Sequence, residues 1–268
     1  MPELPEVETT RRGILPYSEG KVLSEIEVRN PKLRWPISEP LMHWKPDTLH
    51  TLSRRGKYII MEFASGSVLV HLGMSGSVRV MERGARVQKH DHVDFVFGEK
   101  VLRFNDPRRF GSILWTEDWK NHQLIRKLGP EPLSEHFYDD YLYKASRGRK
   151  ISIKQFIMDS HIVVGVGNIY ANEALFMSGI HPSRSAGRVS KTRYRILVSN
   201  IKQVLTSAIE QGGTTLRDFV GGDGKPGYFQ QTLFVYGRQG QACKRCNHTL
   251  KEVRHSGRST VFCGACQT

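Results

Sequence analysis

The four cysteines of the chain all fall near its end, as two Cys-x2-Cys pairs. Cys243 and Cys246 form the first pair and Cys263 and Cys266 the second, with sixteen residues between the pairs. Two pairs at this separation suit a tetrahedral Zn²⁺ ion, because each pair can supply two thiolates. Four protein ligands leave no position for water, so the spacing predicts one structural zinc ion. The alternatives are two disulfides or four unrelated cysteines, and a reducing compartment disfavours the disulfides.

The N-terminus offers a second kind of chemistry. Residue 2 is a proline, small enough for Met1 to be removed, which would expose a secondary amine whose reference pKa is about 8. Such an amine can condense with a sugar aldehyde to give a permanently cationic iminium, an electron sink for elimination of the flanking phosphates. Glu3 and Glu6 lie beside it, and a carboxyl group there suits a general acid or base. The alternative is that Pro2 and Pro5 merely begin a helix.

The composition favours a polyanionic partner. The 268-residue chain carries 40 Lys and Arg against 26 Asp and Glu, a net charge of +14. This excess is typical of nucleic-acid-binding proteins, although a ribosomal or otherwise basic housekeeping protein would share it. No apolar run approaches the roughly 20 residues that span a bilayer, and the start of the chain lacks the apolar core of a signal peptide. We therefore expect a cytosolic protein that does not bind membranes.

The first half of the chain reads as strands. Seven short runs are β-branched or aromatic and end at Gly, Asn or Asp, which favours a β-sandwich. The runs are Val22–Arg29, Tyr58–Phe63, Val68–Met74, Val78–Met81, Val93–Phe97, Val101–Phe104 and Ser112–Trp115.

The second half reads as helices. Apolar residues recur at helical spacing from Tyr194 to Ala208, and Gly212-Gly213 follows as a stop signal. Two shorter helices are predicted on either side of the turn Gly165-Val166-Gly167-Asn168, one over Ile153–Ser160 and one ending near Met177.

These patterns predict an α+β chain in four parts: an N-terminal β-sandwich domain with an N-terminal helix (1–116), a linker (117–150), a helical domain (151–235) and a zinc module (236–268).

Three motifs together resemble one known family. Pro2 to Thr9 reads PELPEVET, Gly165 to Glu173 reads GVGNIYANE, and the cysteine module follows in the same order as in formamidopyrimidine-DNA glycosylases (Fpg). The resemblance covers essentially the whole chain. It implies a β-sandwich, a helix–two-turns–helix DNA-binding domain and a C-terminal zinc finger. It also implies a bifunctional enzyme of base excision repair, which removes 8-oxoguanine and formamidopyrimidines from duplex DNA and then carries out β,δ-elimination at the abasic site.

The resemblance implies four catalytic residues. Pro2 matches the Schiff-base nucleophile, Glu3 the general acid/base and Lys57 the catalytic lysine at the start of a strand. A solvated lysine at a strand edge is the alternative for Lys57. Arg258, between the two cysteine pairs, matches the arginine of δ-elimination, and a basic hairpin fixed by zinc also suits phosphate binding.

Met74, Arg108 and Phe110 match the residues that fill the space left by a flipped base. An enzyme that acts on a base must extrude it from the stack, and apolar wedges such as Met and Phe can enter the gap, while Arg can face the orphaned cytosine. Ordinary core packing is the alternative for Met74 and Phe110. The neighbouring Gly and Pro residues place both segments on loops, which favours the void-filling role.

Further contacts with DNA are implied by the resemblance. His90, Lys154 and Asn168 match residues that contact the DNA backbone, and Arg108 joins them. Arg149 is a further candidate, with a solvated basic linker as the alternative.

A glycine-rich segment follows the long helix, and we expect it to close over the flipped base as a lesion loop. Its candidate contacts are Thr214, Thr215, Arg217 and Tyr228. A disordered surface loop is the alternative for this segment.

One departure from the family concerns the first cysteine pair, where Asn247 stands in place of the expected glycine, but Asn tolerates the same left-handed backbone.

Two other functions compete with the main one. An endonuclease VIII-like glycosylase would remove oxidised pyrimidines, and a non-catalytic protein would bind DNA through its zinc finger alone. We expect a monomer that acts in the bacterial cytoplasm, associated with the nucleoid through its substrate, double-stranded DNA.

Overall fold

The computed structural model describes residues 2–213 and 233–268. The chain divides into two compact units. The first contains Met1–Arg126 with Ile209–Gln230, and the second contains Lys127–Ala208 with Gln231–Thr268. No helix in the described part of the chain is long and apolar enough to cross a membrane.

The first unit is built on two four-stranded antiparallel sheets. One has the order β10-β6-β5-β4, with β4 at Thr51–Arg55, β5 at Tyr58–Phe63, β6 at Gly66–His71 and β10 at Ser112–Thr116. The other has the order β2-β8-β9-β7, with β2 at Glu25–Val28, β7 at Ser77–Glu82, β8 at Asp91–Phe97 and β9 at Lys100–Asn105. The short strands β1 (Val22–Leu23) and β3 (Asp47–Thr48) pair with each other, and α2 spans Glu39–Met42.

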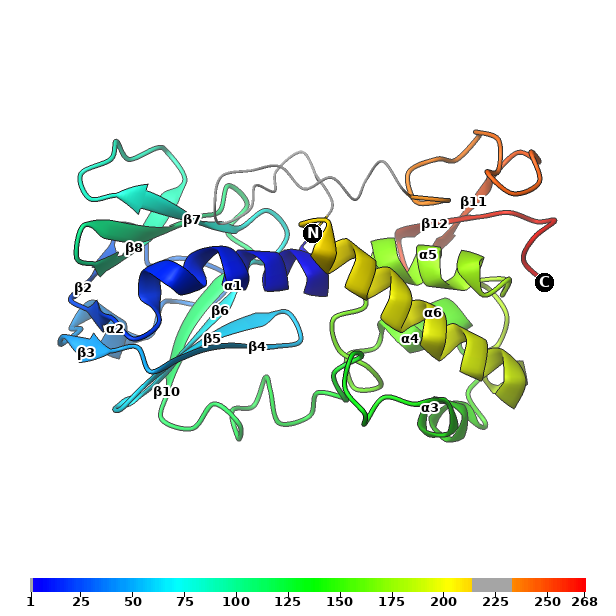
Figure 1. Ribbon diagram of the computed structural model, residues 1–268, viewed down its shortest axis with the longest axis horizontal. Helices are drawn as coiled ribbons and strands as arrows, with labels where there is room; N and C mark the ends of the chain where they lie inside the picture. The colour runs from blue at the N-terminus through cyan, green and yellow to red at the C-terminus, as the bar shows by residue number, and fades with distance from the viewer. Residues whose placement is uncertain (1, 214–232) are drawn as a thin grey trace. The chain divides into compact units, whose positions relative to one another are not determined.

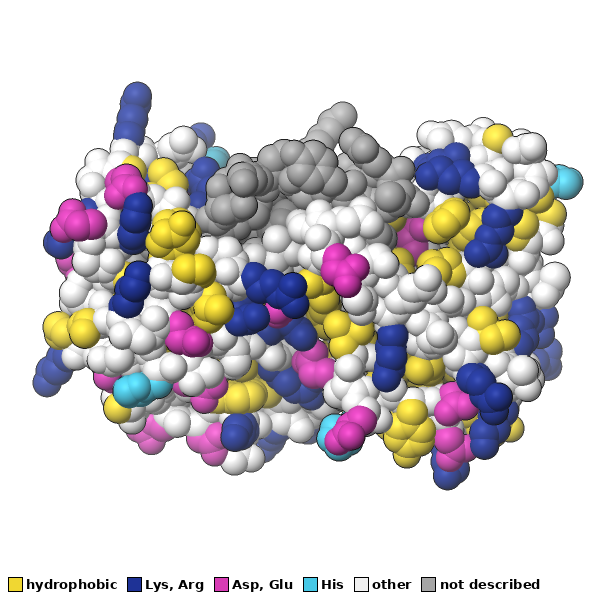
Figure 2. All heavy atoms as spheres, viewed as in Figure 1, with side chains coloured by type: hydrophobic (Ala, Val, Ile, Leu, Met, Phe, Trp, Pro, Cys, Tyr) yellow, Lys and Arg dark blue, Asp and Glu magenta, His cyan; other side chains and the backbone are white. Residues whose placement is uncertain are grey.

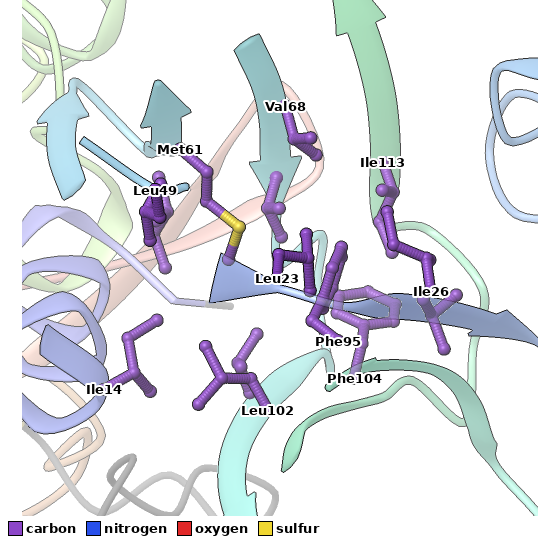
Figure 3. Packing of buried hydrophobic residues seen from close by; sticks show 14 of the residues in the cluster. Ile14, Leu23, Ile26, Leu49, Met61, Val68, Phe95, Leu102, Phe104 and Ile113 are labelled. Carbon is purple, nitrogen blue, oxygen red and sulfur yellow. The ribbon is translucent and has the colours of Figure 1, made fainter. Parts of the chain in front are cut away.

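A hydrophobic core joins strands of both sheets to the N-terminal helix. Figure 3 shows Met61 and Val68 of one sheet in the same cluster as Phe95 and Leu102 of the other, with Ile14 from the helix. Their alternation along the strands leaves one face of each sheet apolar, and burial of that face is the main source of the stability of a sandwich.

The helix α1 (Leu4–Ser18) packs on β7, β4 and β5. Because β7 and β4 are edge strands of different sheets, α1 contacts both sheets (Figure 1). A capping box between Glu3 and Glu6 begins the helix, with Pro5 in its first turn, where a missing amide proton costs nothing. The predicted N-terminal helix and β-sandwich are confirmed.

The second unit is helical and ends in a small hairpin (Figure 1). The elements are α3 (Asp139–Ser146), α4 (Ile153–Met158), α5 (Asn168–Met177), the 3-10 turn η1 (Ala186–Arg188), α6 (Lys191–Glu210), β11 (Lys251–His255) and β12 (Arg258–Phe262).

The predicted positions of the helices hold well. Tyr194, Leu197 and Ile201 of α6 are fully buried, and both Gly212 and Gly213 have positive φ just after the helix ends. The helix α4 ends at Met158, two residues before the predicted end.

One local prediction was wrong, and two elements were missed. The run Val22–Arg29 is broken at Ser24, so β1 and β2 join different sheets. Strand β4 was missed because its sequence, TLSRR, is polar and belongs to a sheet edge. Helix α3 was missed within the predicted linker; it has acidic residues in its first turn and buries Leu142.

Candidate functional site

In the first unit, the residues predicted to do chemistry begin at the N-terminus. Pro2 and Glu3 are buried, and Glu3 is the N-cap residue of α1. The amide of Glu3 donates to Glu6 Oε2 at 2.8 Å, which fixes the direction in which the chain enters the helix. Gly213 packs against the Glu6 side chain.

Ion pairs around the buried carboxylate of Glu8 connect α1 to β4. The Glu8 carboxylate accepts from Arg11 and Arg12 of its own helix, at 2.8 Å each, and from Arg54 Nε at 3.2 Å. Burial alone would raise the pKa of Glu8, but these hydrogen bonds and the nearby positive charges lower it to about 2. Glu8 is therefore a permanent anion at neutral pH.

The same network fixes the turn that carries Lys57. Arg54 also donates from Nη1 to the carbonyl of Gly56 at 3.0 Å, and Gly56 takes the positive φ that the β4–β5 turn needs. Lys57 follows directly, so its backbone is held to α1 through Arg54 and Glu8. The network thus orients the lysine turn relative to the helix that carries Pro2 and Glu3.

His71 stands beside Lys57 and was missed in the sequence. It ends β6, pairs with Tyr58 on β5, and accepts a 3.0 Å hydrogen bond from the Gly73 amide at Nδ1. Burial, together with the charges of Lys57 and Arg34, lowers the pKa of His71 to about 4. The ring is therefore neutral at physiological pH. An isolated His at the end of an apolar strand gives no signal by which sequence reasoning could find it.

The three predicted void-filling residues lie on two loops, residues 72–76 and 106–111, which we call the wedge loops. Met74 and Phe110 are exposed by 40% and 44% respectively, although both are large and apolar. The guanidinium of Arg108 lies 5.1 Å from the centre of the Phe110 ring. Exposed apolar groups on loops argue against the core-packing alternative.

The carboxylate of Asp106, fully buried, joins the wedge loops. It accepts from Ser75 Oγ at 2.7 Å and from the Gly111 amide at 2.8 Å. At Gly73 (φ +64°), a Cβ would collide with the backbone of Phe110 and Gly111, so only glycine permits this approach of the loops. Sequence reasoning missed Asp106; the turn signal Asp106-Pro107 was its only trace.

His90 lies next to the wedge loops and is partly buried. Its carbonyl accepts from the Asp106 amide at 3.0 Å, and its ring centre lies 6.4 Å from that of His92. The first unit therefore brings His90, Met74, Arg108 and Phe110 together around Asp106.

In the second unit, the turn between α4 and α5 presents Asn168 as the first residue of α5. Gly167 is its N-cap, and the first amides of the helix point out of its N-terminus, as in many anion sites. The Asn168 amide oxygen is buried and accepts no hydrogen bond from the described residues. Asn172 Nδ2 donates to the Asn168 carbonyl at 2.6 Å, while its Oδ1 accepts from the Val261 amide at 3.0 Å. Asn172 thus joins this helix end to β12.

Lys154 makes contacts that sequence reasoning did not foresee. It is 1% exposed, and its Nζ donates to the Ser259 carbonyl at 2.8 Å and to Thr260 Oγ1 at 2.7 Å. These acceptors lie on β12, so the ammonium holds the hairpin against α4. Its predicted phosphate contact stays a prediction.

The four cysteines lie together at one end of this hairpin as free thiols, with their sulfur atoms within 4.8 Å of one another. Sulfurs that are 2.3 Å from a tetrahedral zinc would be about 3.8 Å apart, so the set fits one ion with small adjustments. Asn247 has a φ of +62°, the left-handed conformation expected at this position. The disulfide alternative is not supported by this arrangement.

The other predicted residues are placed as follows. Arg258 begins β12 and is exposed, and Arg149 is exposed in the turn after α3, where its carbonyl accepts from Gly187. The predicted lesion-loop residues Thr214, Thr215, Arg217 and Tyr228 lie outside the described residues.

Basic side chains are spread over the face seen in Figure 2, with acidic ones between them. The net positive charge therefore does not form a single patch on that face.

Comparisons with known proteins agree with these features. Sequence models match three successive spans: the formamidopyrimidine-DNA glycosylase N-terminal domain over residues 1–113, the H2TH domain of the same enzymes over 128–220, and the zinc finger found in FPG and IleRS over 240–268. The formamidopyrimidine-DNA glycosylases of Marinobacter nauticus and Saccharophagus degradans are 56% and 58% identical to the chain, each over 100% of both chains.

Solved structures give the same result. The MutM (Fpg) protein of Thermus thermophilus is 35% identical with a TM-score of 0.90, covering 99% of this chain and 98% of its own. The Lactococcus lactis Fpg in complex with DNA containing an abasic site is 32% identical with a TM-score of 0.91, covering 99% of both chains.

The β-sandwich, the paired helices α4 and α5 and the four-cysteine finger together define a class of protein. This class is the helix–two-turns–helix DNA glycosylases. Within this class, the chain belongs to the formamidopyrimidine-DNA glycosylase family.

Proposed function

We propose that this protein removes oxidised purines, 8-oxoguanine and formamidopyrimidines, from duplex DNA and then cuts the strand at the resulting abasic site. Family membership supports the activity, since the relatives are enzymes and one solved relative, from Lactococcus lactis, is bound to DNA containing Fapy-dG. Neither the endonuclease VIII-like nor the non-catalytic alternative fits this family. We further propose that the enzyme is a monomer acting at the bacterial nucleoid, with domains at 1–116, 151–235 and 236–268 and a linker at 117–150.

The first chemical step is assigned to Pro2 and Glu3. The secondary amine of Pro2 attacks C1′ of the damaged nucleotide, and the electrons of the broken glycosidic bond leave with the base, which takes up a proton. Glu3 suits the transfer of protons to and from the sugar, because it adjoins the amine in sequence and is buried. Opening of the sugar ring then leaves an iminium on the proline nitrogen.

The iminium draws electrons from the sugar in two eliminations. Loss of a sugar proton expels the 3′ phosphate, and a second loss expels the 5′ phosphate, so that the sugar is released by hydrolysis of the imine. Lys57 is assigned to the reacting nucleotide, beside the neutral ring of His71. Arg258 is assigned to the phosphate that leaves in the δ step. When zinc is bound, Cys243, Cys246, Cys263 and Cys266 hold it, and it stabilises the hairpin that carries Arg258.

The wedge loops are assigned to the space that the flipped base vacates. Met74 and Phe110 offer apolar surface to the stack, and Arg108 offers donors to the base left unpaired. His90, Arg149, Lys154 and Asn168 are assigned to the DNA backbone. The lesion loop with Thr214, Thr215, Arg217 and Tyr228 stays the candidate reader of the damaged base.

The observation that carries the proposal is the arrangement around α1. Pro2 and Glu3 stand at the start of a helix whose position relative to the lysine turn is fixed by Glu8 and Arg54. A proline that merely began a helix would not need this ionic link to Arg54, which holds the turn before a lysine far away in sequence.

Two variants of residue 2 test the nucleophile. Pro2→Gly keeps an amine at residue 2, whereas Pro2→Leu prevents removal of Met1 and moves the amine one residue outward. With borohydride and duplex DNA carrying one 8-oxoguanine, we expect the wild type and Pro2→Gly to form a covalent adduct at residue 2, located by peptide mass spectrometry. Pro2→Leu should form several orders of magnitude less. Full trapping by Pro2→Leu with Met1 retained would refute the assignment of Pro2.

That duplex and a matched one carrying an oxidised pyrimidine together test the substrate class. Nicking at 8-oxoguanine but only weakly at an oxidised pyrimidine is the expected result. The reverse preference would favour the endonuclease VIII-like alternative, and binding without nicking would favour the non-catalytic one.

A further inference from the structure

A guanidinium is buried on the β2-β8-β9-β7 sheet, on the face opposite the hydrophobic core. Arg103 of β9 is 2% exposed, and it alternates with Leu102 and Phe104, which belong to the core. Its cross-strand partner on β8 is Asp94, also buried. The two form a bidentate pair, Nε to Oδ1 at 2.9 Å and Nη2 to Oδ2 at 2.7 Å.

The remaining donor of Arg103 reaches into a loop. Nη1 donates to the carbonyls of Ala85 and Arg86, at 3.1 Å each. These residues belong to the segment between β7 and β8, residues 83–90, which we call the basic loop. One side chain thus fixes two successive peptide units of the loop to the sheet below it.

A second buried acid holds the other end of the basic loop. Asp91 accepts from the Gln88 amide at 2.8 Å, and Asn105 Nδ2 holds the same carboxylate at 2.8 Å. Arg79 adds a contact at 3.3 Å. The backbone of the loop is therefore fixed at both ends by side chains of the sheet.

Burial of these charges needs an explanation. A buried ion pair is rarely more stable than a well-packed apolar pair of similar size. An apolar residue at position 103 could not donate to two loop carbonyls, whereas the planar fork of Arg can hold Asp94 and the loop at once. The charges therefore specify the position of the loop rather than adding stability.

The basic loop presents its cations to solvent. Arg86 and Lys89 are both exposed, and neither forms an ion pair with a described residue. The acids nearest in sequence are engaged elsewhere, since Glu82 pairs with Lys100 and Asp91 is buried beneath the loop. Arg83 differs, because it lies 3.9 Å from Glu25.

The loop ends next to the wedge loops. His90, its last residue, accepts at its carbonyl from the amide of Asp106, the residue whose carboxylate joins those loops. A duplex that engages Met74 and Phe110 would thus have its backbone near the cations of the basic loop. Phosphates are the anions that such a surface would meet.

We propose that the basic loop is an additional phosphate-binding element for duplex DNA, in which Arg86 and Lys89 contact the backbone beside the wedge loops and Arg103 acts as the positioning residue. This inference rests on the proposed function. It adds two DNA contacts and one positioning residue to those that the sequence predicted.

Single substitutions of the two cations test the contacts. The affinity for a duplex with an uncleavable abasic-site analogue is measured over a range of salt concentrations. Arg86→Ala and Lys89→Ala should each make the slope of log affinity against log salt shallower by about one unit, because one fewer counterion is released. Lys45→Ala, an exposed lysine of the same unit but in a different segment, is the control with the same change of charge.

Arg103→Lys tests the positioning role. It keeps the positive charge but cannot reach Asp94 and two carbonyls together, so its salt slope should fall toward that of the Arg86→Ala/Lys89→Ala double variant. Adding Lys89→Ala to Arg103→Lys should then change the slope little. Single-turnover excision of 8-oxoguanine at low salt and saturating enzyme should stay within about twofold of wild type, since the catalytic groups are untouched.

The outcomes separate the inference from the function beneath it. Unchanged slopes for both exposed variants, with a wild type that excises 8-oxoguanine, would overturn the phosphate-binding loop alone. An equal fall with Lys45→Ala would also overturn it, because the effect would then be one of net charge. A wild type that binds but never nicks would overturn the proposed function instead. Arg86 and Lys89 are exposed, so these tests do not depend on whether Arg103→Lys folds.

Discussion

The sandwich and the finger hold their functional residues by different means. The sandwich has a large apolar core. Its buried acids Glu8, Asp94 and Asp106 accept hydrogen bonds from Arg54, Arg29 and Ser75, and each of these partners lies far away in sequence. The cluster around the finger is small: Phe176, Val235, Cys243, Leu250, Val261 and Cys263, and two of its six members are themselves proposed zinc ligands. A group this small cannot fold on apolar burial alone.

This difference shows which interactions stabilise each region and which ones position its functional residues. In the sandwich, hydrophobic burial supplies the stability, and buried carboxylates determine where the loops lie. In the finger, metal binding must supply the stability, and buried polar groups of α4 and α5, Lys154 and Asn172, determine where the hairpin lies. Disturbing the buried carboxylates of the sandwich should therefore cause a different loss of function from disturbing the metal site or the buried polar groups that hold the finger.

Removal of zinc should have the largest effect. Because the binding energy of a structural zinc is also folding energy, the metal-free finger should unfold and carry Arg258 with it, weakening DNA binding by on the order of 100-fold or more. Hydrogen exchange should show lost protection in β11 and β12 but unchanged protection in β6 and β9. Metal analysis should find one zinc per chain.

Cys266→Ser provides the control for the chelator, because it removes one ligand without adding a reagent. If the metal-free protein bound DNA as well as the zinc form, or if β6 and β9 lost protection too, the contrast between the two regions would be wrong.

Substitution of Lys154 should have an intermediate effect on activity. It distinguishes two roles of this residue, positioning of the hairpin and direct contact with a phosphate. Lys154→Met keeps most of the volume but leaves the Ser259 carbonyl and Thr260 hydroxyl without their buried partner, at a cost of about 1–3 kcal/mol. We expect about a tenfold loss of δ-elimination product relative to β-elimination product, resolved on a gel, with glycosylase activity less affected.

A double-mutant cycle with Arg258→Ala supplies the second measurement. If Lys154 acts through the hairpin, the two losses will not add, because Arg258→Ala already removes the group that Lys154 positions. If Lys154 contacts a phosphate directly, the losses will add and the salt slope will fall by about one unit. Thr260→Val is the comparison variant: it leaves Lys154 its bond to the Ser259 carbonyl and removes the hydroxyl, with its longer contacts to His255 and the Arg258 carbonyl.

The sequence indicated the secondary structure and the chemistry of this protein well. It indicated less well the residues that hold the functional side chains in position. Periodicity located the core strands and α6, and three motifs located Pro2, the turn before Asn168 and the cysteines. Strand β4 escaped because Leu52 is its one apolar residue, and helix α3 because it is short and buries one apolar side chain, that of Leu142.

The supporting residues could not be found from the sequence, for a physical reason. Arg54 and Glu8, Ser75 and Asp106, and Lys154 and Ser259 become partners only when strands or helices from distant positions pack together. Each of these polar residues is ordinarily found at a surface, so its type alone predicts solvent exposure. Lys154 illustrates this: lysine is ordinarily exposed, whereas in this structure the side chain is buried and its ammonium donates to the hairpin.

The smallest effect on activity is expected at Glu8, where the change should appear in stability. The pKa of Glu8 falls from its ordinary value of 4.5 to about 2 in the folded chain, so the unfolded chain binds more protons between these two values. The stabilisation is then fully present above about pH 5 and is lost as the pH falls toward 2. Since the site is only partly shielded from solvent, we expect Glu8→Gln to lower the free energy of unfolding by about 1–2 kcal/mol at pH 7.

Denaturant unfolding of wild type and Glu8→Gln from pH 7 to pH 3 measures this difference. The difference in the free energy of unfolding should be constant down to about pH 5 and narrow below it. Excision of 8-oxoguanine at pH 7 should stay within about twofold of wild type, because Gln keeps a side-chain oxygen that can accept from Arg54 and so leaves the lysine turn in place. Glu25→Gln, at an exposed pair whose oxygen and nitrogen are 3.9 Å apart, is the control and should show almost no gap at any pH. A gap that persisted unchanged to pH 3 would mean that the Glu8 side chain stabilises α1 by packing rather than by charge. The buried acids would then not be the common device by which the sandwich places its functional residues.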